Sequence, residues 1–90
     1  MESKVRAIAA NQRDIIGLDK CHVRKMLLSF YVDLHIVVNG QLSVREGHCL
    51  AHKVQAEVLR ALPQVSEVLV HVEPEEEEEL AVEGQKDGRR

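Results

Sequence analysis

The sequence predicts an α+β domain in which two helices cover one side of a three-stranded sheet. The chain has 90 residues, which is room for one small core. Apolar residues recur at helical spacing in two segments and alternate with polar residues in three others. Each alternating segment has a single apolar face. Helices therefore need to cover only one side of the sheet, and the other side is expected to stay open.

The first predicted helix spans residues 3–16, where apolar side chains repeat every three or four positions. Ser3 is expected to cap its start, and Gly17 to end it. A short strand is expected next, over residues 19–26, with Cys21 on its core side. We interpret this cysteine as a small core residue.

Residues 30–38 form the clearest predicted strand, because apolar and polar side chains alternate along it. Its apolar face comprises Phe30, Val32, Leu34 and Ile36, and its polar face comprises Tyr31, Asp33 and His35. The connection over residues 26–29 is a weak hairpin signal, since it contains no Gly, Asn or Asp.

The second predicted helix starts at a capping box, in which Ser43 is followed three residues later by Glu46. Pro63 is expected to end it. Its expected buried stripe consists of small and apolar residues: Val44, Gly47, Ala51, Val54, Val58 and Leu62. A third strand is expected over residues 67–73, with Val68, Val70 and Val72 facing the core and Leu69, His71 and Glu73 facing away.

Charge divides the chain into two parts. Residues 1–73 carry nine Lys/Arg and eight Asp/Glu, whereas residues 74–90 carry three and seven. We therefore expect a folded domain over 1–74 and an acidic, disordered tail over 75–90. The nearly neutral folded part has no nucleic-acid footprint. No apolar run approaches the ~20 residues that cross a bilayer, so we expect a cytoplasmic chain without direct membrane insertion.

Candidate metal ligands occur in closely spaced pairs. Asp33 and His35 lie two apart on one strand, and His71 and Glu73 lie two apart on another. His48 shares a helix with the weaker candidate His52, four residues later. Imidazole and carboxylate groups together are the ligand set for zinc and similar ions. Polar strand residues face away from the core in any protein, however, so a plain solvated surface explains the strand pairs as well.

Two further candidates are weaker. His22 is expected on the open face of the first strand, and Cys49 on the outer face of the second helix, where its thiol could bind a soft metal. An open sheet face that also bears Tyr31 and Leu69 is a natural contact for a second copy of the chain. Catalysis is not supported: the sequence has no Gly-rich phosphate loop and no nucleophile elbow.

Four motifs, in this order, resemble the C-terminal cytoplasmic domain of the cation diffusion facilitator (CDF) transporters. They are Asp19 to Lys25 (DKCHVRK), Tyr31 to His35 (YVDLH), Leu42 to His48 (LSVREGH) and Val70 to Pro74 (VHVEP). The resemblance covers about residues 3–74. It implies a ferredoxin-like αββαβ fold and a V-shaped homodimer that binds divalent metal at and beside the dimer interface. The positions that match family ligands are Asp33, His35, His48, His71 and Glu73.

The resemblance therefore suggests a non-enzymatic regulatory domain in which metal binding changes the dimer angle. The mixed nitrogen and oxygen ligands fit Zn²⁺ best, with Fe²⁺, Mn²⁺, Cd²⁺, Co²⁺ and Ni²⁺ also compatible. The expected partners are a second copy and a CDF transmembrane domain or transporter. Two alternatives stay open: a free-standing metal carrier, and a plain dimerisation module with incidental histidines.

Overall fold

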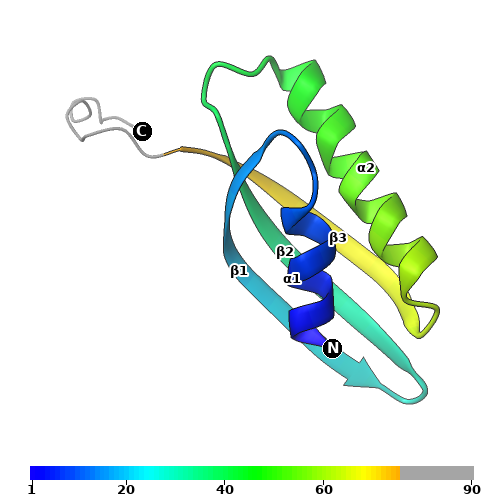
Figure 1. Cartoon of the computed structure of the whole chain (residues 1–90). Coiled ribbons are helices and arrows are strands. Elements are labelled where there is room, and N and C mark those ends of the chain that lie inside the picture. The colour runs from blue at the N-terminus through cyan, green and yellow to red at the C-terminus, as the bar shows by residue number, and fades with distance from the viewer. Residues whose placement is uncertain (76–90) are drawn as a thin grey trace, which may run out of the picture.

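The computed structural model describes residues 1–75 and confirms the predicted α+β class. Its elements follow the order α1 (Glu2–Ala10), β1 (Ile15–Met26), β2 (Ser29–Val38), α2 (Val44–Ala61) and β3 (Val65–Pro74). The central strand β2 pairs with β1 antiparallel and with β3 parallel. Both helices lie against one side of this sheet (Figure 1).

The core lies between the sheet and the helices and is aliphatic, as the composition predicts. On β2, Val32, Leu34, Ile36 and Val38 are at most 3% exposed. They join a buried cluster with Val5 and Ala9 from α1 and with Leu50, Val54 and Val58 from α2. Each fully buried Val, Leu or Ile side chain contributes about 1.5–3 kcal/mol. Within residues 1–75, no helix covers the opposite face of the sheet (Figure 1).

The prediction of a helix over residues 3–16 is wrong at its end. Helix α1 ends at Ala10, its N-cap is Met1 rather than Ser3, and Gly17 lies inside β1. Ile15 pairs with Val38 of the central strand. Isoleucine is stiff at χ1, which disfavours a helix and suits a pleated strand, so pairing with β2 overrides the local periodicity.

Helix α2 begins and ends as predicted. The Ser43 hydroxyl accepts a hydrogen bond from the Glu46 amide, while the Glu46 carboxylate accepts one from the Ser43 amide. The helix ends at Ala61, two residues before Pro63. The predicted buried stripe is wrong at Val44, which is 91% exposed. Val44 is the first helical residue and projects beyond the end of the core, and the stripe omitted the buried Leu50.

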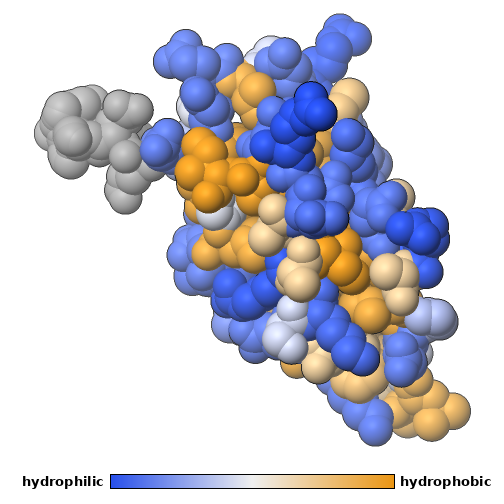
Figure 2. All heavy atoms as spheres, viewed as in Figure 1, coloured by the Kyte–Doolittle hydropathy of each residue, from blue (hydrophilic) through white to orange (hydrophobic). Residues whose placement is uncertain are grey.

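The turn between β1 and β2 carries two exposed leucines. Met26 pairs with Ser29, so only Leu27 and Leu28 form the connection, and both are 93% exposed. Leu27 has a φ of 58°, the left-handed region that a tight hairpin turn requires. Hydrophobic side chains stand at the lower right end of the molecule in Figure 2, where Figure 1 has this turn.

The third strand is longer than predicted and keeps the predicted alternation at its centre. Val68 is fully buried, whereas Val72 near the end of β3 is 38% exposed. Apart from Glu75, the predicted acidic tail lies outside the described residues. Among residues 1–75, neither helix has the length and apolar character that a membrane crossing requires.

Candidate metal centre

Two histidines meet at the middle of the open sheet face. His35 of β2 and His71 of β3 are direct partners in the parallel register. Their rings stack with centroids 4.4 Å apart and planes inclined by 23°. The alternation of both strands turns these side chains away from the core, because Leu34, Ile36 and Val68 fill the buried side. The predicted sharing of one face by these two histidines is confirmed.

Asp33 completes a three-residue group with these histidines. One ligand atom from each of Asp33, His35 and His71 lies within 4.8 Å of the others. Oδ1 of Asp33 is 2.9 Å from Nε2 of His71, but it is shielded from solvent and, among residues 1–75, has no hydrogen bond of acceptable geometry. A shielded carboxylate oxygen without a hydrogen bond is costly. The surroundings of this oxygen are therefore suitable for contact with a cation.

Glu73 forms a hydrogen bond with the His35 ring. Its Oε2 lies 2.6 Å from Nδ1 of His35, and both side chains are partly buried. This hydrogen bond is the main reason why the pKa of Glu73 lies below its usual value, with smaller contributions from Asp19 and Lys20 and an opposing one from desolvation. With Nδ1 occupied by the carboxylate, Nε2 of His35 is the nitrogen left for another partner.

Asp19 is a site residue that the sequence analysis missed as a ligand. It forms a second group with His35 and Glu73, again with ligand atoms within 4.8 Å. Plain alternation would place Asp19 on the same side as the buried Cys21. The register shift between Leu18 and Lys20 inserts one extra residue and brings Asp19 to the open face instead. Only the strand pairing reveals this bulge.

The other predicted candidates lie apart from these two groups. His22 is exposed and stands opposite Asp33 in the β1–β2 register, but it joins neither group. His48 and His52 contact each other on α2 instead. Cys49 is exposed on the same helix, and Cys21 is buried, which raises the pKa of its thiol. The predicted contact residues are both accessible on the sheet, Tyr31 partly and Leu69 at 54%.

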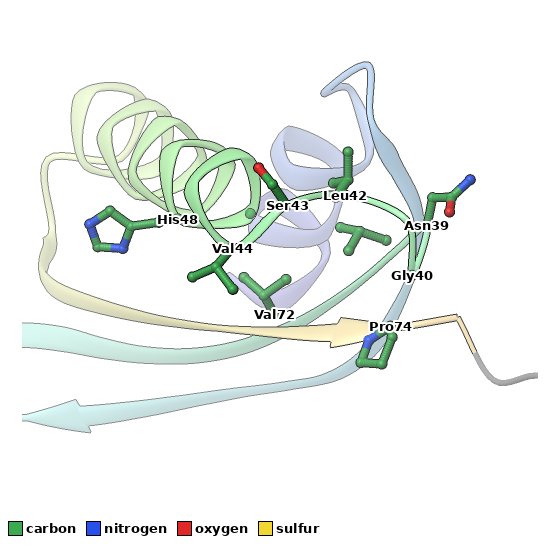
Figure 3. A pocket seen from close by; sticks show the side chains of 10 residues that line it. Asn39, Gly40, Leu42, Ser43, Val44, His48, Val72 and Pro74 are labelled. Carbon is green, nitrogen blue, oxygen red and sulfur yellow. The ribbon is translucent and has the colours of Figure 1, made fainter. Parts of the chain in front are cut away.

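A cavity of about 380 Å³ opens between the start of α2 and the end of β3. Its walls are mostly apolar and include Leu42, Val44 and Val72 (Figure 3). His48 leaves α2 beside β3 and is the titratable residue among those that line it. A single imidazole against apolar walls provides no acid–base pair. The sheet face is therefore the stronger candidate site.

Comparisons with known proteins identify the family. The sequence model described as "Cation efflux protein, cytoplasmic domain" matches residues 1–75. Metal tolerance protein C1 of Arabidopsis thaliana is 36% identical over 61 residues, a match that covers 64% of this chain and 13% of the relative. The chain thus corresponds to a small part of that longer protein.

Solved structures of known proteins share this fold. A variant of MamM CTD has a TM-score of 0.79 and 20% identity, with 81% of this chain and 91% of that chain covered. A nickel form of another MamM CTD variant has a TM-score of 0.79 and 19% identity, with 82% and 94% covered. The ferredoxin-like fold expected from the sequence is thereby confirmed. This chain belongs to the family of cytoplasmic domains of cation efflux proteins.

Proposed function

We propose that this chain is a homodimeric regulatory domain that binds a divalent metal ion and thereby controls a cation efflux transporter. The observation that carries the proposal is the cluster of imidazoles and carboxylates on the open sheet face. Within it, Oδ1 of Asp33 is shielded from solvent and lies 2.9 Å from Nε2 of His71, but the described residues give it no hydrogen bond of acceptable geometry. A cation beside this oxygen would compensate its lost hydration.

The three direct ligands are Asp33, His35 through Nε2, and His71. Glu73 accepts the Nδ1 proton of His35 and so fixes the tautomer and ring orientation, as carboxylates behind metal-bound histidines do. Asp19 lies beside Glu73 and adds negative charge to the region. Two nitrogens and one oxygen suit Zn²⁺, and Ni²⁺ is compatible with the same set. The nickel form of a MamM CTD variant is consistent with a divalent ion in this fold.

The open sheet face is the proposed dimer interface. Three ligands from one chain leave at least one position of a tetrahedral zinc ion unfilled. A second copy packed against Tyr31 and Leu69 would bring its own donors, or a bound water, to that position. Leu69 is apolar and 54% exposed in the single chain, so its burial would favour such packing.

Metal would act by favouring one arrangement of the two copies. An ion shifts the population only if it binds that arrangement more tightly than the others. A tenfold preference corresponds to ~1.4 kcal/mol, which one additional metal–imidazole bond can supply. In this proposal residues 1–74 form the metal-binding dimerisation domain, and residues 75–90 form an appended acidic tail.

Calorimetric titration with Zn²⁺ tests the metal site. We expect the double variant His35→Ala/His71→Ala to lose the heat of binding that the unaltered chain gives. His22→Ala removes an exposed histidine outside both groups and should leave the titration unchanged. Equal heats from the unaltered chain and the double variant would refute the site.

Small-angle scattering with and without Zn²⁺ tests the regulatory step. We expect added Zn²⁺ to make the dimer more compact, or to narrow the distribution of distances between its two domains. This change should occur only when the metal ligands are intact. A dimer whose scattering ignores both Zn²⁺ and chelator would instead indicate a plain dimerisation module.

A further inference from the structure

A second pair of histidines lies outside the sheet-face groups, on the exposed side of α2. His48 and His52 are four residues apart, about one helical turn, so their side chains leave the helix from the same face. Their Nε2 atoms are 3.1 Å apart, and their rings meet edge to face with centroids 4.4 Å apart. Both side chains are exposed, so an ion could reach them directly from solvent.

The distance between the two nitrogens is close to that of a chelate. Metal–nitrogen bonds of about 2.0–2.1 Å hold two nitrogens about 2.9 Å apart when they meet at about 90°, and about 3.4 Å apart at a tetrahedral angle. The 3.1 Å separation, which in the metal-free chain is that of a hydrogen bond between the two rings, lies between these values, so both nitrogens can reach one ion after a small adjustment. Among the divalent ions of the first transition row, Ni²⁺ and especially Cu²⁺ bind nitrogen ligands most tightly, which favours them at a site with only two protein ligands.

The helix beneath the pair is held in place, so only the two side chains have to be ordered on binding. Both histidines follow the Ser43–Glu46 capping box. Farther along α2, Nε2 of Gln55 donates to the Val68 carbonyl oxygen at 2.8 Å and ties the helix to β3. A hollow of about 190 Å³ beside both rings leaves room for the ion's remaining water ligands.

We propose that His48 and His52 form a second, solvent-accessible metal site that binds one Cu²⁺ or Ni²⁺ through both Nε2 atoms, with water in the other positions. Neither residue contributes to the sheet-face groups. The site belongs to a single chain, requires no dimer and does not rest on the function proposed above. With two protein ligands, it should bind more weakly and exchange ions faster than the three-ligand cluster.

Titration of the full chain with Ni²⁺, and separately with Cu²⁺, tests this site in the background His35→Ala/His71→Ala. This background removes the sheet-face ligands and leaves α2 intact. We expect one remaining ion per chain, and an affinity at least about tenfold lower after the further change His52→Ala. The electron paramagnetic resonance spectrum of bound Cu²⁺ should indicate two imidazole nitrogens before this change and one after it.

Two controls separate chelation from the mere presence of histidine. His22→Ala removes an exposed histidine elsewhere and should not change the remaining affinity. The exchange His52→Ala/Lys53→His keeps the number of histidines but turns the second ring about 100° around the helix, so it should abolish the gain from chelation. Circular dichroism verifies that each variant keeps its helices.

Either of two results would overturn the inference: residual Ni²⁺ and Cu²⁺ binding that is unaffected by His52→Ala, or binding fully restored by the exchanged histidine. Both results would leave the zinc titration of the sheet face untouched. Conversely, loss of the sheet-face proposal would not alter the expected behaviour of His48 and His52. The two failures can therefore be told apart.

Discussion

At the scale of single residues, His35 is the centre of the candidate site because it takes part in both ligand groups. Its Nδ1 faces Glu73, and its other nitrogen is left for the group with Asp33 and His71. A neutral imidazole has one proton and one lone pair, so it cannot bind two ions at once. The two groups are therefore alternatives, and one chain should hold one ion on its sheet face.

The hydrogen bond between Glu73 and His35 predicts a pH-dependent contribution to stability. The pKa of Glu73 is lower in the folded chain than its usual value of 4.5. Its carboxylate therefore stabilises the fold above that value, and this contribution disappears as the pH falls through the lower folded pKa. In thermal unfolding without metal, Glu73→Gln should destabilise the chain near neutral pH, and this effect should shrink as the pH falls below 4.5.

Glu67→Gln is the matched control for this prediction. Glu67 lies on the same strand and stands opposite Tyr31 in the register, whereas the Glu73 side chain is hydrogen-bonded to His35. Replacement of Glu67 should shift the unfolding midpoint by a similar small amount at every pH. If the difference between the unaltered chain and Glu73→Gln stays constant down to pH 3, the hydrogen bond does not stabilise the fold in the way described.

At the scale of elements, the β1–β2 turn contains a correctable strain. Leu27 adopts a positive φ, which costs an L-residue about 1–2 kcal/mol, and its side chain is 93% exposed. Leu27→Gly removes the strain at a smaller cost in chain entropy. We expect a net stabilisation of about 0.5–1 kcal/mol, and hence a rise of several degrees in Tm by thermal circular dichroism.

Leu28→Gly separates backbone strain from the loss of an exposed leucine. Leu28 is equally exposed. Among the non-glycine residues of the described part, however, only Leu27 has a positive φ. Leu28→Gly should therefore leave Tm unchanged or lower it. If both glycine variants behave alike, the positive φ of Leu27 is not a source of strain.

The elements were predictable where local pattern and tertiary pairing agree. The alternation along residues 30–38 and the capping box at Ser43 each correspond to one structure only, and both predictions are confirmed. The helix prediction is wrong over residues 11–16, because their helical spacing continues past Ala10 while pairing of Ile15 with β2 begins a strand. Local periodicity contains no information about such a partner.

The candidate site likewise has a part that the sequence predicts and a part that it does not. The two-residue period of strands predicted that Asp33, His35, His71 and Glu73 share the open face, and the structure brings them together. Asp19 could not be found in this way, because its position depends on a register shift against β2. The unsatisfied oxygen of Asp33 is likewise a property of the packed sheet, since no local sequence pattern describes the surroundings of one atom.

At the scale of the whole molecule, the open sheet face predicts a dimer that a single charge can weaken. Leu69 is 54% exposed in the single chain, so Leu69→Lys should not disturb the core. In a packed interface the same ammonium group would lose most of its hydration, and the carboxylate of Asp33, its neighbour in register, would offset this loss only in part. We expect the dimer dissociation constant to rise at least about tenfold in sedimentation velocity experiments.

Leu28→Lys provides the comparison for the dimer experiment. It adds the same charge at a residue that is 93% exposed at the hairpin turn. This control should leave the dimer unchanged. A Leu69→Lys chain that stays as dimeric as the control would place the interface elsewhere on the molecule.

The bulge in β1 has a consequence for solubility during folding and storage. Both outer strands of the sheet, β1 and β3, have one edge without a neighbouring strand within the described residues. Such edges invite further chains to add on and begin aggregation. The register shift beside Asp19 interrupts the regular ladder of β1, and Lys20 follows it directly. Deleting Asp19, the extra residue of this bulge, would thus both remove a candidate ligand and leave a more regular edge to which the strand of another molecule could add.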